Sequence, residues 1–206
     1  MIKLQSKYCY PGTDVLINKF NIRDAKHLLS IEKTITSTKI GELRNKPIKG
    51  QFDIDHLKKI HKYIFGDIYP FAGEFRDESI IKGNVRFANP LYIEENSIKL
   101  FKELKNENYL VGLDKDKLSQ RLAYYFAEIN ILHPFREGNG RTQREFIREV
   151  ALLSGYDIDW RLIDRSEYMN ASIKSVYDTK PLENLIKKHL SPSQLMQKNR
   201  DMEQEM

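Results

Sequence analysis

The sequence predicts an all-α fold: a helical bundle that carries one small β-hairpin. Apolar residues recur at helical spacing in successive stretches, and several of these stretches follow an aspartate that can cap a helix. A Lys82-Gly83-Asn84 turn lies between short runs rich in β-branched and aromatic residues, which is typical of a hairpin. The 206 residues are enough for one domain with a substantial core.

The first part of the chain combines irregular segments with one long helix. Residues 1–13 are expected to form an extended lead-in, and residues 14–20 a short helix. Asp24 can cap a longer helix, because apolar residues follow it at helical spacing. A proline and two glycines predict that residues 41–52 form a loop.

A second helix is expected from the cap residue Asp53 to about Phe65, with an apolar inward face. His56 and His61 lie on this helix. Their separation of five residues is poor for two metal ligands on one helix face, where three or four is needed. Packing roles are therefore favoured over a metal pair.

The hairpin is predicted from residues 74–81 and 85–87, after a break at residues 69–73. An isolated hairpin is marginally stable, so this one must lean on the helical body or on a partner. Residues 90–106 then read as a helix, and residues 106–117 as a polar link.

The remaining elements are mainly helices. A short helix around Trp160 is expected within a loop at residues 157–164, and Gly155 is a plausible helix stop. Helices are expected over residues 118–131, 141–154, 165–177 and 181–190.

The most informative stretch lies between the helices at 118–131 and 141–154. It reads His133-Pro134-Phe135-Arg136-Glu137-Gly138-Asn139-Gly140-Arg141-Thr142-Gln143-Arg144. Its position predicts a tight turn that leads into a helix, which presents free backbone N–H groups and a positive dipole end to a ligand. Gly138, Asn139 and Gly140 let the backbone approach a ligand closely, and their N–H groups suit a phosphate.

The charged side chains of this stretch suit a polyphosphate with a metal ion. Arg141 and Arg144 share a helix face near its N-terminus, where two guanidiniums are unfavourable unless an anion joins them. A di- or triphosphate meets that need, because arginine binds phosphate oxygens in a fork. Glu137 is a hard oxygen ligand of the kind that Mg²⁺ takes together with phosphate oxygens. His133, with an ordinary pKa of about 6.5, is mostly neutral at pH 7 and suits a general base.

Each of these features also has a structural interpretation. A lone histidine before proline is more often structural than catalytic. A Gly-Asn-Gly turn is usually only a turn, and an arginine pair at helical spacing is usually a solvated face. Their combination within twelve residues makes chance assembly a poor explanation.

The stretch matches the signature H-x-F-x-[D/E]-G-N-G-R-x-x-R at every fixed position, and the chain resembles the Fic (Fic/Doc) family. The similarity extends over about residues 5–190 and includes the segments 8–16, 56–61 and 69–76. The resemblance implies a single domain over residues 1–190, a Fic-type helical bundle with a small β-hairpin flap over the active site. Its parts are a lead-in at 1–13, the flap at about 74–88 and the motif at 133–144, with a polar tail at 191–206.

The resemblance also implies an activity, the transfer of AMP from ATP to a Tyr, Ser or Thr hydroxyl of a target protein with release of pyrophosphate. A related branch that transfers phosphate has lysine at the position of Gly140, so glycine there favours nucleotidyl transfer. The family assigns the general base to His133, the Mg²⁺ ligand to Glu137, the phosphate loop to Gly138, Asn139 and Gly140, and the outer-phosphate contacts to Arg141 and Arg144.

The flap of the family contacts the nucleotide or the target. On the resemblance, Ile80, Ile81, Lys82 and Gly83 lie at these contacts, and the backbone of the target protein adds to the flap as a strand. A surface loop is the structural alternative for this segment.

The family places adenine-pocket residues within the segment 165–177. Tyr168 matches one such position and Met169 flanks it, with core packing as the alternative for both. Two other functions stay open. One is transfer of another nucleotide or phosphate-linked group, because the loop reads phosphates rather than the base. The other is a catalytically silent nucleotide-binding interaction module.

Many proteins of this family are restrained by a helix bearing [S/T]-x-x-x-E-[G/N], whose glutamate pairs with the second motif arginine, here Arg144. Residues 179–184 are the one formal match and contain Glu183, but they overlap the closing helix. Residues 38–43 fail the pattern at its last position. We therefore expect a small antitoxin-like protein to supply the glutamate in trans.

Composition narrows the possible functions and the expected cellular location of the protein. The net charge is +5 and the pI is about 9.1. The basic residues are spread along the chain and form no block, so nucleic-acid binding is not expected. Cys9 is the only cysteine, which excludes an intrachain disulfide and a cysteine metal site and fits a reducing cytoplasm. No signal-peptide core and no membrane-spanning apolar run are present, so we expect a cytoplasmic protein, with export by a signal-independent route left open.

Overall fold

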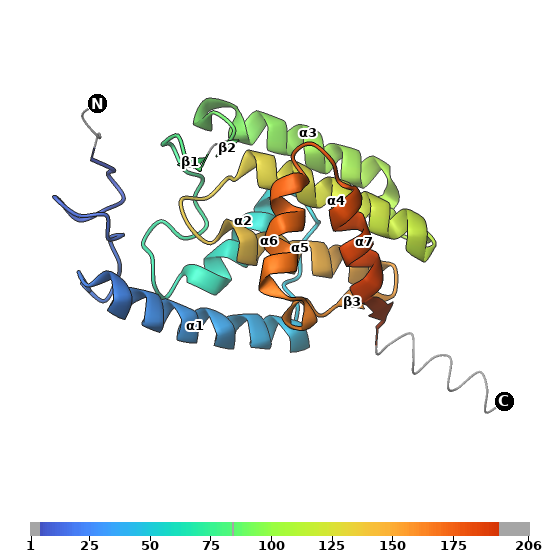
Figure 1. Cartoon of the computed structure of the whole chain (residues 1–206), viewed down its shortest axis with the longest axis horizontal. Helices are drawn as coiled ribbons and strands as arrows, with labels where there is room; N and C mark the ends of the chain where they lie inside the picture. Colours follow the sequence, from blue (N-terminus) through green and yellow to red (C-terminus); the bar gives the residue numbers. More distant parts are fainter. Residues whose placement is uncertain (1–4, 84, 194–206) are drawn as a thin grey trace.

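The structure of the protein is a computed structural model that describes residues 5–83 and 85–193. Within these ranges, α-helices make up the body and two small antiparallel sheets lie beside it (Figure 1). This confirms the predicted all-α fold with a small hairpin. The helices are α1 (Ala25–Asn45), α2 (Ile54–Phe65), α3 (Ile93–Asn106), α4 (Lys115–Leu132), α5 (Asn139–Leu153), α6 (Arg165–Lys174) and α7 (Lys180–His189). The strands are β1 (Ile81–Lys82), β2 (Val85–Arg86), β3 (Tyr156–Ile158) and β4 (Leu190–Pro192), and the short 3₁₀ turns are η1 (Pro90–Tyr92), η2 (Asn108–Leu110) and η3 (Trp160–Leu162).

The core is built around α4 and α5, which pack against each other. Helix α4 also packs against α3 and α7, and α5 packs against α2 and β3. Figure 1 shows α3 and α1 on opposite sides of this central pair. Phe126 of α4 and Phe146 of α5 are fully buried between these layers. The turn that joins α4 to α5 therefore lies between two helices that are both packed in the core.

Aspartate caps begin α1 and α2 as the sequence predicts. The side chain of Asp24 accepts a hydrogen bond from the N–H of His27 (2.7 Å), and that of Asp53 accepts one from His56 (2.9 Å). The loop predicted for residues 41–52 is wrong over residues 41–45, because α1 continues to Asn45. Leu43, which is 1% exposed, anchors this last turn of α1 in the core.

The helix predicted for residues 14–20 is also wrong. This segment folds back on the lead-in through an isolated bridge between Cys9 and Leu16. The N–H of Tyr10 donates to the carbonyl of Val15 (2.9 Å). These bonds to the lead-in occupy backbone groups that a helix would use within itself.

The predicted hairpin is present, although its strands are shorter than expected. Ile81 pairs with Arg86 and Lys82 with Val85 in the antiparallel sheet of β1 and β2. We call the hairpin that carries these strands, residues 80–83 and 85–87, the flap; the N–H of Phe87 donates to the carbonyl of Ile80 (3.3 Å) at its base. The second small sheet, formed by β3 and β4, was not predicted; in it Asp157 pairs with Ser191. Most of the predicted polar tail, residues 194–206, lies outside the described residues.

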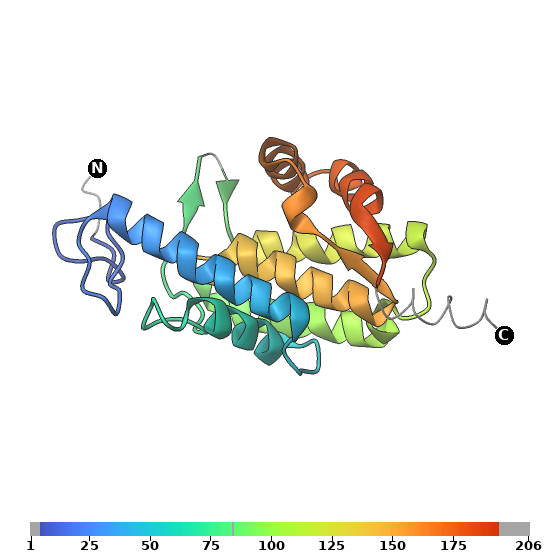
Figure 2. The same cartoon turned by 90° about the horizontal axis from the view of Figure 1, so that it is seen from below.

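The flap and α6 rise from the same side of the α4–α5 pair (Figure 2). The N-terminal end of α5 lies between their bases, so segments far apart in the sequence meet at the motif. Among residues 5–83 and 85–193, no helix combines the length and apolar character that a membrane crossing needs.

Candidate active site

The motif forms the predicted turn between α4 and α5. His133 ends α4 with φ +43°, and its N–H donates to the carbonyl of Ile129 (3.0 Å). Gly138 precedes α5 with φ +80°. The Asn139 side chain accepts a hydrogen bond from the N–H of Phe135 (2.8 Å) and donates one to its carbonyl (2.7 Å). The Asn139 side chain therefore shapes the turn, and its backbone N–H is left for a ligand.

Two backbone N–H groups at the start of α5 are available to an anion. Those of Asn139 and Gly140 have no hydrogen-bond partner within the described residues. The N–H of Gly138 donates to the carboxylate of Glu137 (2.9 Å). Since both free groups lie at the positive end of the helix dipole, they form the kind of cradle that binds phosphate.

Gly138→Ala should destabilise the protein more than a positive φ alone explains. An alanine there would keep φ near +80° and place its Cβ within the van der Waals radius of the Phe65 ring. Gly112 is a matched control, because its φ is +85° and the space around it is open. In urea unfolding we expect Gly112→Ala to cost about 1 kcal/mol and Gly138→Ala about 1–3 kcal/mol more. Equal costs for the two variants would contradict the close packing of the turn on α2.

The imidazole of His133 is buried beneath the flap. His133 is 6% exposed, and its ring stacks on that of Phe87 with centroids 3.8 Å apart and planes 13° apart. Neither ring nitrogen makes a hydrogen bond of full geometry within the described residues. Burial lowers the pKa of His133 to about 3, with smaller contributions from the charges of Lys82 and Arg76, and the nearby backbone of Asn130 raises it slightly. The ring is therefore neutral at pH 7 and keeps a nitrogen lone pair, and burial makes it a weaker base than a solvated imidazole.

Arg76 connects the motif to the flap, a role that the sequence reasoning did not assign. Its buried guanidinium donates to the carbonyls of Leu132 (3.2 Å) and His133 (2.8 Å) at the end of α4. It also donates to the carbonyls of Glu78 (2.6 Å) and Ala88 (2.7 Å), on the two sides of the flap. The resemblance over residues 69–76 was the only signal that drew attention to this residue. One side chain thus fixes the position of His133 relative to the hairpin that covers it.

A cavity of 710 Å³, which we call the catalytic cavity, brings together residues from three parts of the chain. The predicted site residues that do not line it are Ile80, Ile81, Glu137, Gly138, Asn139 and Arg141. Ile81 is 63% exposed. Phe87 and Val85 of the hairpin line the cavity and were not predicted as site residues. The predicted residues that do line it are His133, Gly140 and Arg144 from the motif, Lys82 and Gly83 from the flap, and Tyr168 from α6. Met169, which flanks Tyr168, also lines the cavity.

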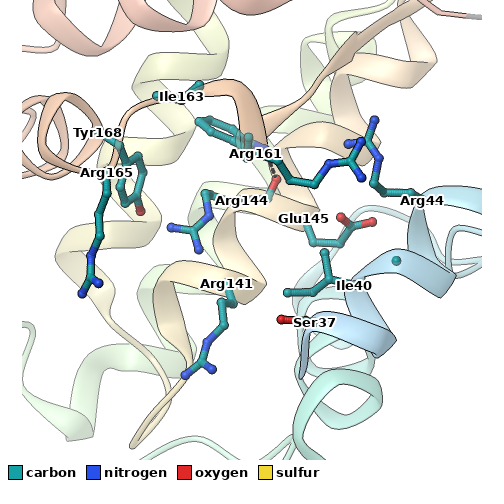
Figure 3. A pocket seen from close by; sticks show the side chains of 12 residues that line it. Ser37, Ile40, Arg44, Arg141, Arg144, Glu145, Arg161, Ile163, Arg165 and Tyr168 are labelled. Atoms are coloured by element: carbon teal, nitrogen blue, oxygen red, sulfur yellow. Dashed lines mark hydrogen bonds between the residues drawn. The ribbon is translucent and has the colours of Figure 1, made fainter. Parts of the chain in front are cut away.

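The two motif arginines have different partners. The guanidinium of Arg141 makes an ion pair with Glu32 of α1 (2.7 Å) and donates to the hydroxyl of Thr36 (3.2 Å). Glu32 is buried and also accepts a hydrogen bond from the hydroxyl of Tyr69. Arg144 has no carboxylate partner within the described residues; its guanidinium lies 4.7 Å from the centroid of the Tyr168 ring (Figure 3). Arg144 is thus the motif arginine whose charge is free for an anion.

Replacing the two arginines should separate these roles in the protein without ligand. Arg141→Ala leaves the buried carboxylate of Glu32 without its cation, so we expect a loss of about 2 kcal/mol in the free energy of unfolding. Arg144→Ala removes no ion pair and should cost less than about 1 kcal/mol. Adding Glu32→Gln to Arg141→Ala should recover part of the loss in urea unfolding. Equal losses for the two single variants, with no recovery in the double variant, would refute the Glu32 pairing.

The Glu137 carboxylate is suited to a hard cation. It lies beside the cradle, accepts from the N–H of Gly138 (2.9 Å) and lies 3.6 Å from the guanidinium of Arg141. No group of three His, Cys, Asp or Glu side chains that could hold a metal occurs among the described residues. A single carboxylate fits Mg²⁺, which takes its other ligands from phosphates and water.

His61 supports the turn from behind, as the predicted packing role requires. Its Nε2–H donates to the carbonyl of Glu137 (2.9 Å), and its Nδ1 accepts from the N–H of Gly73 (2.8 Å). The ring also stacks on Phe135, with centroids 3.9 Å apart. Burial, with a smaller contribution from the charge of Arg141, lowers the pKa of His61 to about 4.

Stability should therefore fall in acid partly through His61. Its folded-state pKa is below the ordinary value of about 6.5, so the unfolded chain binds the extra proton between about pH 6.5 and pH 4. This contribution, up to about 3 kcal/mol, is lost as the pH falls through that window. Thermal unfolding of His61→Gln should depend less on pH there than that of the wild type. The exposed His27 is the control, and His27→Gln should show the same dependence of stability on pH as the wild type. The same dependence in His61→Gln would argue against a lowered pKa of His61.

The two glutamates considered as internal inhibitors have other partners. Glu183 lies in α7 and makes an ion pair with Lys180 (2.6 Å). Glu42 lies in α1 and accepts a hydrogen bond from the hydroxyl of Tyr63 (2.6 Å). Neither contacts Arg144 within the described residues.

The fold is a helical bundle with a hairpin beside the motif, and the site combines a buried, neutral imidazole with two backbone N–H groups, free among the described residues, at a helix N-terminus. A model of the Fic/DOC family matches residues 51–151. "Protein adenylyltransferase VbhT" of Bartonella schoenbuchensis is 44% identical over 89% of this chain, which spans 39% of that protein. "Probable protein adenylyltransferase Fic" of Escherichia coli is 37% identical over 80% of this chain and 82% of that protein. The chain belongs to the Fic/DOC family.

Solved structures agree with this assignment. The N-terminal Fic domain of a VirB-translocated Bep effector protein from Bartonella quintana, with bound ADP, has a TM-score of 0.86 and 29% identity, covering 92% of this chain and 96% of that one. BepC from Bartonella tribocorum, with bound AMPPNP, has a TM-score of 0.84 and 26% identity, covering 91% and 97%.

Proposed function

We propose that this chain is a protein adenylyltransferase, which transfers AMP from ATP to a Tyr, Ser or Thr hydroxyl of a target protein and releases pyrophosphate. The observation that carries the proposal is the meeting of His133, Gly140 and Arg144 on one cavity, with the N–H of Gly140 free among the described residues. Relatives named as adenylyltransferases and related structures that hold ADP or AMPPNP support it.

The proposed reaction is an in-line displacement at the α-phosphorus of ATP. The free N–H groups of Asn139 and Gly140 hold the α-phosphate at the positive end of α5. A nitrogen of His133 accepts the proton of the target hydroxyl as its oxygen bonds to the α-phosphorus. The bond from that phosphorus to the bridging oxygen breaks, and pyrophosphate leaves with the electron pair. Arg141 and Arg144 hold its two phosphates.

Glu137 is the residue proposed to hold Mg²⁺. When bound, this ion neutralises charge that develops on the leaving pyrophosphate. The position of the carboxylate next to the N–H cradle and the arginines suits an ion that bridges protein and phosphates.

The flap is proposed as the docking edge for the target. Its two-stranded sheet leaves outer edges that a third strand can join, and Ile81 offers an exposed apolar contact there. Lys82 and Gly83 line the catalytic cavity from the same hairpin. A strand added to the flap would therefore carry its side chains toward His133.

Restraint by a small antitoxin-like protein is proposed because Arg144 lacks a carboxylate partner among the described residues of this chain. A glutamate supplied in trans would occupy the guanidinium that the outer phosphates need. A purified chain that is silent alone and becomes active on Glu183→Gly would overturn this regulation.

Incubation of the purified chain with labelled ATP and a cell lysate tests the function. Mass spectrometry should find AMP on hydroxyl side chains of a small set of proteins. Parallel reactions with GTP, CTP and UTP identify the preferred base. Binding of ATP without any modified protein would favour the silent interaction module instead.

A further inference from the structure

Residues of the lead-in contact the segment that runs into the flap, and both lie at the same end of the molecule (Figure 1). The carboxylate of Glu78 accepts hydrogen bonds from the hydroxyl of Ser6 (2.7 Å) and from the N–H of Lys7 (2.8 Å). Asp77 accepts a hydrogen bond from the hydroxyl of Tyr8 (2.9 Å) and makes an ion pair with Lys7. We call these bonds between residues 6–8 and residues 77–78 the lead-in contact.

The lead-in side of this contact is attached to the body of the protein. The ring of Tyr8 packs edge-on against that of Phe71, with centroids 5.2 Å apart. The carbonyl of Tyr8 accepts a hydrogen bond from the N–H of Ile17 (2.8 Å), and the next residue, Cys9, is buried. Residues 6–8 therefore offer the flap an attachment point that is itself held in place.

Glu78 joins the lead-in to the hydrogen bonds of Arg76. The guanidinium of Arg76 donates to the carbonyl of Glu78 (2.6 Å) and to that of His133 (2.8 Å). Glu78 is half-buried, with the lead-in on its carboxylate and Arg76 on its carbonyl. Strand β1 begins three residues later, at Ile81. The position of β1 relative to His133 therefore depends on how Glu78 is held.

The first strand of the flap buries little surface of its own. Ile81, Lys82 and Gly83 are all exposed, and each strand of the hairpin is two residues long. A two-stranded sheet of this kind is only marginally stable by itself. The hydrogen bonds at its base therefore matter more for its position than the packing of its side chains.

We propose that Glu78 is a positioning residue for target docking. Its carboxylate, held by the lead-in, fixes the edge of the flap to which the backbone of the target adds as a strand. The inference rests on the proposed function, because that function makes the flap the docking edge. Strand addition is tighter when the edge already has the geometry of a strand, so a flap that moves more should bind the target less well.

The nucleotide site is separate from this contact. The residues of the lead-in contact do not line the catalytic cavity: Ser6, Lys7, Tyr8, Asp77 and Glu78. Binding of ATP should therefore not depend on the carboxylate of Glu78. This separation distinguishes a role in target docking from a role in holding the nucleotide.

Amide hydrogen exchange of the chain without ligand tests the contact itself. The N–H of Phe87, which donates to the carbonyl of Ile80, reports the opening of the flap. We expect Glu78→Ala to speed its exchange about tenfold, because hydrogen bonds to a half-buried charged group are lost. Glu78→Gln keeps an acceptor and should lie between alanine and the wild type. Glu95→Ala is the matched control, since this carboxylate pairs with Lys99 within α3, and it should leave the exchange unchanged.

Transfer kinetics test the role in docking, with the protein that the labelling experiment identifies as the target. We expect Glu78→Ala to raise the KM for this protein about fivefold, and to leave kcat within about twofold. The Kd of a non-hydrolysable ATP analogue, measured by calorimetry, should also stay within about twofold. A merely structural role would lower the folded fraction, which reduces the apparent kcat and leaves the KM for the target unchanged.

Each outcome decides the matter. Unchanged exchange at Phe87 in Glu78→Ala would overturn the proposal, whatever the enzyme does. Faster exchange with an unchanged KM for the target, or the same rise in KM in Glu95→Ala, would overturn the role in docking. If the wild type modifies no protein, the proposed function fails and the docking role fails with it, whereas hydrogen exchange still decides whether the lead-in holds the flap.

Discussion

His133→Ala is expected to lower AMP transfer by about 10²–10⁴-fold, the effect of removing a general base. The side chain is buried beneath Phe87, and burial keeps it neutral at pH 7. Binding of ATP should persist, because the N–H cradle and both motif arginines remain. Transfer is measured with labelled ATP and a target, and binding by calorimetry with a non-hydrolysable analogue.

The matched control for this variant is His27→Ala, which removes an exposed imidazole on α1. It should leave both transfer and binding unchanged. Undiminished labelling by His133→Ala would remove the imidazole from the mechanism. Loss of ATP binding in the same variant would show that the residue holds the site together instead.

Arg76→Ala is expected to lower the free energy of unfolding by at least about 3 kcal/mol, because four buried or half-buried carbonyls lose their charged donor. The free energy of unfolding of Arg76→Lys should lie between those of the wild type and Arg76→Ala, since an ammonium cannot reproduce the guanidinium fork. Urea unfolding measures both variants, and transfer by the folded fraction reports the placement of His133.

Arg161→Ala is the control for Arg76→Ala. Its side chain is 71% exposed, so its loss should cost less than about 1 kcal/mol. A similar small cost for Arg76→Ala would mean that the flap and the end of α4 hold their positions without this residue.

Local signals in the sequence were enough for much of the fold. The caps at Asp24 and Asp53 act through bonds to residues three positions ahead, so the sequence alone places them. The turn before α5 was predicted from its glycines, and Gly138 has the positive φ that such a turn needs. The helix predicted for residues 14–20 failed because this segment bonds instead to the lead-in, through the Cys9–Leu16 bridge, and to the carbonyl of Ile68, which accepts from the N–H of Lys19 (2.8 Å).

The missed parts of the site depend on contacts between distant residues. Arg76 donates to the carbonyl of His133, 57 positions away. Glu32 and Arg141 are 109 positions apart, and Phe87 reaches His133 from the flap. Spacing rules describe contacts within one helix or strand, so they cannot predict contacts between residues this far apart in the sequence. The motif supplies the candidate site residues, and the structure shows which of them are already paired.

The central claim is that the start of α5 holds the α-phosphate of ATP beside the imidazole of His133. A crystal structure of His133→Ala with ATP and Mg²⁺, compared with the wild type bound to a non-hydrolysable analogue, tests it most directly. We predict that the N–H groups of Asn139 and Gly140 bind the α-phosphate, and that the wild-type imidazole faces the α-phosphorus. A nucleotide bound elsewhere, or an imidazole turned away from that phosphorus, would contradict the account.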